Sequence, residues 1–91
     1  MGLTTFIKDP DAVLDFSFDW SSWLETGESI SSHTITAGSG ITNDSDSESS
    51  GIVTAWISGG TAGSTYTIAC KIVTSLGRTD ERTINIVVAE R

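Results

Sequence analysis

Two stretches near the C-terminal end of the chain alternate between inward and outward side chains, and this hairpin pattern constrains the fold more than any other feature. β-Branched and aromatic residues recur at every second position over 66–73 and again over 84–88, which is the main sequence signal of β-strands. Gly77 lies between them and can adopt the positive φ of a tight turn. We expect one face of this hairpin to enter the core, through Tyr66, Ile68, Cys70, Ile72, Ile84, Ile86 and Val88.

Other segments supply further predicted strands, and no segment has a helical period long enough to compete. Turn signals recur about every 8–12 residues, a spacing typical of small two-sheet domains. We therefore predict a single all-β domain over 1–91, an antiparallel β-sandwich of about seven short strands, with a closed small barrel as the alternative. The further strands are expected at 3–9, 13–20, 28–37, from Ile41 onward as an edge strand, and at 52–58.

The segment 13–20 has the clearest alternation of apolar and polar side chains, which is typical of a strand with one face in the core and one in water. We expect Leu14, Phe16 and Phe18 to form the centre of the core. Trp20 and Trp56 also occupy strand positions that allow a core location.

Two segments are predicted to be irregular. Ile30 and Ile35 fall on opposite faces of 28–37, so a bulge or a shallow edge position is expected there. The segment 43–51 is rich in serine and acidic residues and is predicted to be a mobile loop. Its alternating acids resemble part of a calcium loop but lack the glycine and the distant glutamate that such a loop needs, so no metal site is predicted.

The charge of the chain excludes some functions. Residues 1–50 carry nine acidic residues and only Lys8, a charge of −8, whereas 51–91 carry +1, giving the total of −7. Phosphate backbones repel such a chain, so no nucleic-acid partner is expected. A single cysteine cannot form an internal disulfide. We find neither a signal peptide nor a membrane-spanning run, and expect synthesis in the cytoplasm without membrane association.

No pattern in the sequence indicates catalysis. His33 and many serines and aspartates are present, but no Gly-x-Ser-x-Gly motif accompanies them. His33 is expected to be an exposed residue of a strand or loop. We predict that the protein is not an enzyme and uses no cofactor.

Several sequence blocks resemble a known family. Residues 59–68 and 75–84, with Thr-Tyr-Thr-Ile and Gly-Arg-Thr at their centres, are similar to bacterial immunoglobulin-like modules. Residues 6–16, Phe-Ile-Lys-Asp-Pro-Asp-Ala-Val-Leu-Asp-Phe, and 19–24, Asp-Trp-Ser-Ser-Trp-Leu, resemble a narrower group, the small tail or neck proteins of tailed phages described as fibre–tail adaptors. The resemblance spans 5–89, and the stretch 42–50 departs from it.

This resemblance implies an immunoglobulin-like sandwich that acts as a non-enzymatic component of the virion tail or head–tail neck. Such a protein is present in many copies around a ring and helps to attach fibres. Its expected partners are the portal or connector, the tail tube or nozzle, and the fibre. The alternative is a carbohydrate- or cell-surface-binding module that stacks aromatic side chains on sugars. A domain of a bacterial surface protein is a third hypothesis, which the missing signal peptide weakens.

The predicted partner-binding residues lie in two places. Residues 1–12 are expected to be an edge strand and docking segment. Phe6 and Ile7 are adjacent and point to opposite faces, whereas a half-buried edge strand needs apolar side chains on one face only. Strand pairing with another subunit would cover them. Trp23, which breaks the strand alternation in the 20–24 turn, is expected either to cover the open end of the sandwich or to face a partner. The predicted contact residues are Phe6, Ile7, Lys8, Asp9, Pro10, Trp23 and Leu24.

Overall fold

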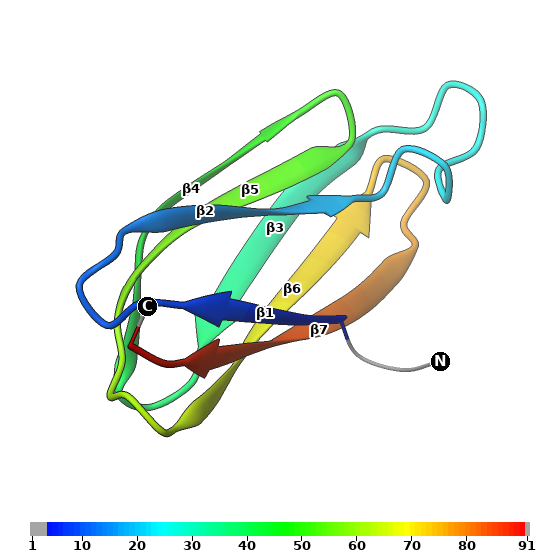
Figure 1. The fold of residues 1–91 in the computed structure, drawn as a ribbon. Helices are drawn as coiled ribbons and strands as arrows, with labels where there is room; N and C mark the ends of the chain where they lie inside the picture. The colour runs from blue at the N-terminus through cyan, green and yellow to red at the C-terminus, as the bar shows by residue number, and fades with distance from the viewer. Residues whose placement is uncertain (1–3, 91) are drawn as a thin grey trace.

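The computed structural model describes residues 4–90, which form two packed β-sheets (Figure 1). These residues contain seven strands and no helix, so the all-β sandwich is confirmed and the closed barrel is not formed. No helix in this part of the chain could therefore cross a bilayer. Leu3, predicted to begin the first strand, lies outside the described residues. The strands are β1 Thr4–Lys8, β2 Leu14–Asp19, β3 Ile30–Ala37, β4 Ile41–Ser49, β5 Ile52–Gly59, β6 Thr65–Thr74 and β7 Thr79–Val88.

One sheet has the order β1-β7-β6-β3 and the other β2-β5-β4. All neighbouring strands are antiparallel except β1 and β7, which run parallel with Thr4 opposite Ile84 and Lys8 opposite Val88. The prediction of a wholly antiparallel sandwich is therefore wrong at this pair. β1 and β7 come from opposite ends of the chain, so no tight hairpin has to join them and either direction is open to them.

The immunoglobulin-like classification remains a prediction, which two features support. The orders β2-β5-β4 and β7-β6-β3 correspond to the B-E-D and G-F-C strands of that fold. The hydroxyl of Tyr66 accepts a 2.9 Å hydrogen bond from the backbone N–H of Thr61, five residues upstream, as in a tyrosine corner. Hydrogen bonding to the side chain of Thr61, and then to its backbone, lowers the pKa of Tyr66.

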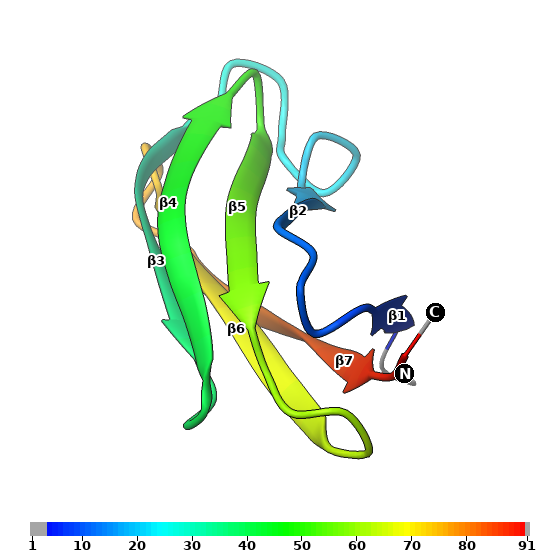
Figure 2. The same cartoon turned by 60° about the vertical axis from the view of Figure 1, so that its left-hand side comes forward.

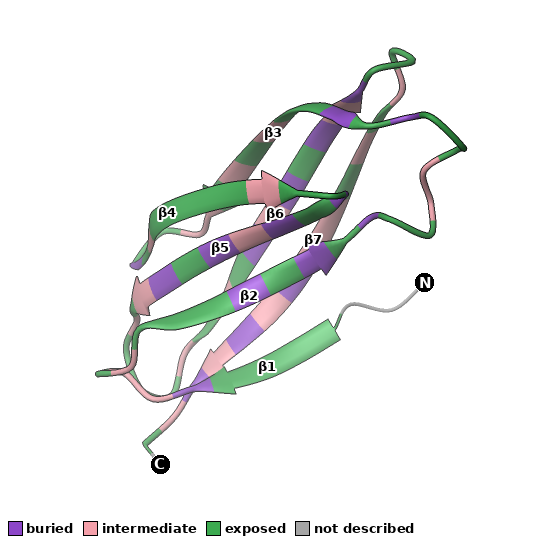
Figure 3. Ribbon diagram, turned by 90° about the horizontal axis from the view of Figure 1, so that it is seen from above, coloured by how far each residue is buried: buried purple, intermediate pink, exposed green. Residues whose placement is uncertain are grey.

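The core lies between the sheets, and burial alternates along the strands, most visibly on β5 (Figure 3). The inward residues predicted for the C-terminal hairpin are confirmed, although Tyr66 is only partly buried. The buried apolar residues are Phe16, Phe18, Trp20, Ile30, Ile41, Val53, Ala55, Ile57, Ile68, Cys70, Ile72, Ile84, Ile86 and Val88.

Leu14, which was predicted to be in the core, and Trp56, whose strand position allowed a core location, both lie elsewhere. Leu14 is 38% exposed, because it begins β2 at the end where β1 and β2 separate into different sheets (Figure 1). Trp56 is 44% exposed. The inward positions of β5 are taken by Val53, Ala55 and Ile57, and the two-residue period directs Trp56 outward.

The acidic segment predicted as a mobile loop is a strand. β4 pairs with β5 from Ile41 to Ser49, with a register shift between Asn43 and Ser45. Backbone pairing with β5 outweighs the low strand propensity of serine and aspartate, and an edge position leaves their side chains in water. Ile41 faces inward, as predicted.

β3, an edge strand of the other sheet, is also irregular. β3 has a register shift between Ile30 and Ser32 and lies at the edge of its sheet, so both of the features expected for this segment occur. His33 on β3 is partly buried rather than exposed, and its Nε2 atom lies 2.7 Å from Oδ1 of Asp46. This contact joins the edge strands of the two sheets.

Candidate docking surface

Exposed apolar side chains gather where β1 and β2 meet at one side of the sandwich. Seven large apolar side chains are exposed in residues 4–90, and four of them lie within 6–14. Clustered exposed apolar residues are the feature that marks interaction sites in general, whereas single scattered ones are ordinary. We call these four residues the N-terminal apolar surface: Phe6 at 36% exposure, Ile7 at 54%, Val13 at 55% and Leu14 at 38%.

The register of β1 determines how this surface is presented. Phe6 lies opposite Ile86 and faces the gap between the sheets, where its ring centroid is 5.2 Å from that of Phe16. Ile7 lies opposite Val87 and faces outward. Leu14 begins β2 on the other sheet, so the four residues flank the opening between the sheets, with Phe6 and Ile7 on opposite faces of β1.

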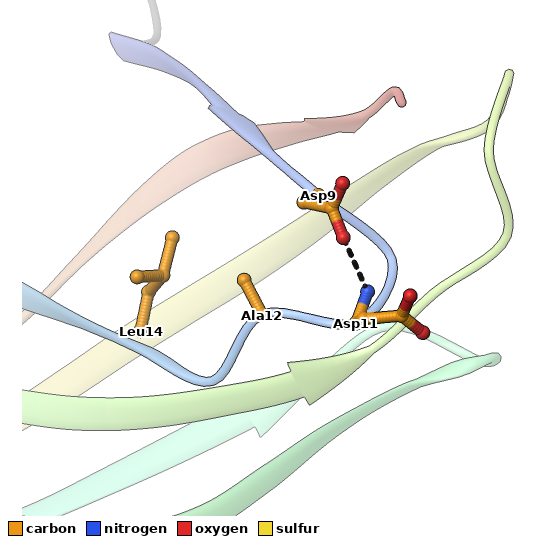
Figure 4. Close-up of a pocket in the computed structure, with 4 residues that line it drawn as sticks. All are labelled: Asp9, Asp11, Ala12 and Leu14. Atoms are coloured by element: carbon orange, nitrogen blue, oxygen red, sulfur yellow. Dashed lines mark hydrogen bonds between the residues drawn. The ribbon is translucent and has the colours of Figure 1, made fainter. Parts of the chain in front are cut away.

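The connection between β1 and β2 is a hydrogen-bonded turn that holds carboxylates beside this surface. The backbone N–H of Asp11 donates to Oδ2 of Asp9 at 2.8 Å, and the N–H of Ala12 donates to the Asp9 carbonyl at 3.1 Å. Asp9, Asp11, Ala12 and Leu14 line a shallow depression, with the side chains of Ala12 and Leu14 directed to the same side (Figure 4). The result is an apolar surface with an acidic rim.

Lys8 closes the end of the sandwich below this surface. Its side chain is fully buried, and its Nζ atom donates to the carbonyl oxygens of Asp9 at 2.9 Å and Gly59 at 2.8 Å. These bonds satisfy a buried ammonium group, as burial requires. Lys8 therefore links β1 to the end of β5, and a partner could reach it only by breaking these bonds.

Trp23 and Leu24 lie in a turn at the far end of β2. The backbone N–H groups of both residues donate to the Trp20 carbonyl, at 2.9 and 3.1 Å. The Asp19 carboxylate accepts the N–H of Ser21 at 2.9 Å and caps the turn, as its position suggests. Both side chains are partly buried against the core, which favours covering the open end over facing a partner.

A stack of aromatic and charged groups fixes this turn to β7 and to the turn that precedes it. The guanidinium of Arg82 lies 4.1 Å from the ring centroid of Trp20, and that of Arg78 lies 4.1 Å from that of Trp23. The two indoles contact edge to face, with centroids 5.6 Å apart. Arg78 also binds both carboxylate oxygens of Glu28, whose side chain is fully buried. The stack explains why this sequence block has two tryptophans.

The Glu28–Arg78 contact predicts acid sensitivity. Hydrogen bonding to Arg78 lowers the pKa of Glu28 from 4.5 to about 2, against the opposing effect of burial. The unfolded chain thus takes up this proton first, so the contact stabilises fully above about pH 4.5 and is lost as the pH falls to about 2. We expect Glu28→Gln to lower the free energy of unfolding at pH 7. The variant should also lose less of this free energy than the wild type as the pH falls from 4.5 to 2.

Urea unfolding followed across that pH range measures this effect. Glu81→Gln, an exposed site with the same change of charge, is the control and should keep the acid-sensitive step. If the free energy of unfolding fell equally with pH in the wild type and in Glu28→Gln, the role given to this contact would be refuted.

The predicted contact residues therefore do not form one surface. Residues 6–10 lie at one end of β2, and Trp23 and Leu24 at the other (Figure 1). Sequence reasoning missed Val13 and assigned Leu14 to the core. The signal was available, because Val13 and Leu14 are adjacent apolar residues at the start of a strand, as Phe6 and Ile7 are within theirs.

Comparison with known families decides the class of the protein. Residues 8–87 match the family described as podophage GP4 fiber-tail adaptor protein gp77. The chain belongs to this family. The resemblance noted from the sequence is confirmed, and the family indicates a structural role in the phage particle together with tail and fibre proteins. The match begins at Lys8, so it does not cover Phe6 or Ile7. No curated protein matches the chain.

In residues 4–90, no group of three His, Cys, Asp or Glu side chains is arranged to hold a metal ion. Cys70 is buried in the core, and burial raises the pKa of its thiol. A thiol in this position is a packing group rather than a nucleophile.

Proposed function

We propose that this domain is a non-enzymatic docking module that seats fibres on the phage tail or head–tail connector, and that it docks through the N-terminal apolar surface. The observation that carries this proposal is the gathering of four exposed apolar side chains at one side of the sandwich. The family supplies the structural role. Several copies arranged around a ring, each with the same surface, bind the particle.

Repetition gives such a module its strength. Four side chains form a small contact, and a single small contact is weak. Copies held side by side on one particle raise the effective concentration of each contact, so the assembly binds far more tightly than one domain. The net charge of −7 keeps free copies apart, so a partner on the particle is needed to bring them together.

The structure gives little support to the sugar-binding alternative. Sugar stacking needs exposed aromatic rings that share a face. In residues 4–90 the large exposed aromatics are Phe6 and Trp56. Phe6 lies on the inner side of β1 and contacts Phe16, whereas Trp56 lies on the outer side of the other sheet.

Incorporation into particles tests the proposed function. We expect Val13→Asp to lower the number of copies per particle by about tenfold when it is co-expressed with the wild type, because a carboxylate at the centre of the contact must be desolvated. The measurement is quantitative mass spectrometry of purified particles. The control is Leu76→Asp, which changes a similarly exposed apolar residue, 62% against 55%, in the turn before β7.

Circular dichroism and thermal unfolding establish that both variants are folded before they are compared. Equal incorporation of Val13→Asp and Leu76→Asp would refute docking through the N-terminal apolar surface. Saturable binding of the wild-type domain to host glycans, with no association with particles, would favour the sugar-binding alternative.

A further inference from the structure

The outer face of the β2-β5-β4 sheet has an exposed tryptophan at its centre. Trp56 is 44% exposed and lies on the middle strand, between Asp15 of β2 and Ser45 of β4. Ile52, on the same face of β5, is 37% exposed. Figure 2 shows β4 and β5 in front of the other sheet, with no segment of residues 4–90 crossing over them.

Carboxylates flank this tryptophan on both sides. Asp15 lies directly opposite Trp56 in the β2–β5 register, which places the two Cβ atoms about 4.5–5.5 Å apart. The carboxylate of Asp44 accepts a 2.9 Å hydrogen bond from Ser58, which lies two residues along β5 on the same face. Within residues 4–90, the Asp15 carboxylate has no hydrogen-bond or ion-pair partner.

No lysine or arginine of residues 4–90 lies on this face. β2, β4 and β5 contain no lysine or arginine. Of their five acidic residues, Asp46 and Glu48 lie opposite the inward-facing Ala55 and Val53. The other three, Asp15, Asp19 and Asp44, lie on the outer face. The basic residues are committed elsewhere. Lys8 is buried, Lys71 points away on the outer face of the other sheet, and the two described arginines stack on Trp20 and Trp23.

The domain contains a template for what this face lacks. At Trp23, an arginine lies over the indole at 4.1 Å and binds the neighbouring carboxylate of Glu28. At Trp56, the indole and the neighbouring carboxylate of Asp15 are present without the arginine. A guanidinium is suited to both contacts at once, because it is planar, always charged and presents several donors.

We propose that the outer face of the β2-β5-β4 sheet docks an arginine-bearing segment of a partner protein, with a guanidinium over Trp56 and bonded to Asp15. This inference rests on the adaptor function proposed above, since an adaptor needs a second surface besides the one that seats it. The face lies on a different part of the sandwich from the N-terminal apolar surface. The acidic charge selects a cationic partner and raises its rate of association.

A peptide titration of the whole ¹⁵N-labelled domain tests the proposal without particles. The probe is the capped peptide Thr-Arg-Thr-Arg-Thr, and its counterpart carries neutral citrulline at both arginine positions. We expect the Trp56 indole signal to shift, while those of Trp20 and Trp23 stay in place. The citrulline peptide should cause no shift, and added salt should weaken binding because the contact is exposed.

Asp15→Asn and Glu81→Gln, which each remove one negative charge, test the geometry together with Trp56→Ala. Asp15→Asn is expected to weaken binding of the arginine peptide about twofold to fivefold, and Trp56→Ala by about the same factor. Glu81→Gln removes one charge from the opposite sheet and should leave the affinity within about 1.5-fold of the wild type at 0.15 M salt, because screening confines the effect to nearby charges.

Equal binding of the citrulline peptide, or equal effects of Asp15→Asn and Glu81→Gln, would overturn the proposal. So would a shift of Trp56 by cellohexaose that is independent of salt, which would identify a sugar face. Because the titration uses no particles, its failure leaves the Val13→Asp incorporation result standing. Failure of that incorporation test likewise leaves the peptide result standing.

Discussion

Replacing Trp20 with alanine is expected to destabilise the domain by about 3–5 kcal/mol, the usual cost of removing a large aromatic side chain from a core. Trp20 is fully buried, and it supports both Arg82 and Trp23. Small domains are stable by only about 5–15 kcal/mol, so the variant should lose a large part of its stability. The fall in Tm should exceed about 10 °C. Urea and thermal unfolding measure both quantities.

Two further substitutions show whether burial is the cause. Trp56→Ala removes the same side chain from an exposed position and should change stability by less than about 0.5 kcal/mol. Among residues 4–90 the indole N–H of Trp20 has no acceptor in hydrogen-bond geometry. Trp20→Phe keeps a ring under Arg82 and removes that N–H, so it should cost clearly less than Trp20→Ala. Similar losses for Trp20→Ala and Trp56→Ala would contradict the described core.

Gly60→Ala is the second substitution for which we expect a large loss, about 2–6 kcal/mol. Gly60 has a φ of +96°, a conformation that costs other residues about 1–3 kcal/mol. An added Cβ would lie 2.6 Å from Cγ2 of Val88, a fully buried residue, and overpacking a core typically costs a further 1–3 kcal/mol or so. The carbonyl of the adjacent Gly59 accepts a hydrogen bond from the ammonium of Lys8, so this turn also supports β1.

Gly63→Ala separates the two causes. Gly63 has a φ of +92°, and nothing lies within 4 Å of its added Cβ. The substitution should therefore carry the backbone cost alone, with the same effect on the unfolded chain. The difference between the two variants in denaturant unfolding measures the contact with Val88. A difference near zero would show that the end of the sandwich relaxes, contrary to the close packing described.

The strands that pair locally were predictable from the sequence, and the reason is physical. The hairpin of β6 and β7 has strict alternation with a glycine turn, so register and inward face follow from the pattern alone. The segment 41–49 was not predictable in the same way, because its serines and aspartates disfavour a strand until β5 supplies a partner. The parallel pairing of β1 with β7 depends on residues about 80 apart and leaves no local signal.

Leu14 and Trp56, the two residues that lie outside the core, show a limit of alternation. A period of two states which residues share a face, but not how far along a strand the core extends. Leu14 shares a face with Phe16, yet it lies beyond the end of the core. For Trp56, the pattern of β5 allowed either face, and the smaller Val53 and Ala55 occupy the inner one.

The candidate docking surface was predictable in part. The excess of apolar residues at 6–7 located the correct end of the domain. The buried ammonium of Lys8 was not foreseen, because its two carbonyl acceptors come together only when β1 and β5 meet. Trp23 stood out for its position, but its contact with Arg78 spans 55 residues of sequence and requires the folded sandwich.

The most direct test of the central claim is photo-crosslinking in assembled particles, with a photoreactive amino acid placed at Val13 and, in a separate variant, at Leu76. Both positions are exposed apolar residues outside the strands, so neither replacement should disturb the fold. Docking through the N-terminal apolar surface predicts that position 13 crosslinks to another particle protein and that position 76 does not. Crosslinks from position 76 alone, or none from position 13 in particles with normal copy number, would contradict it.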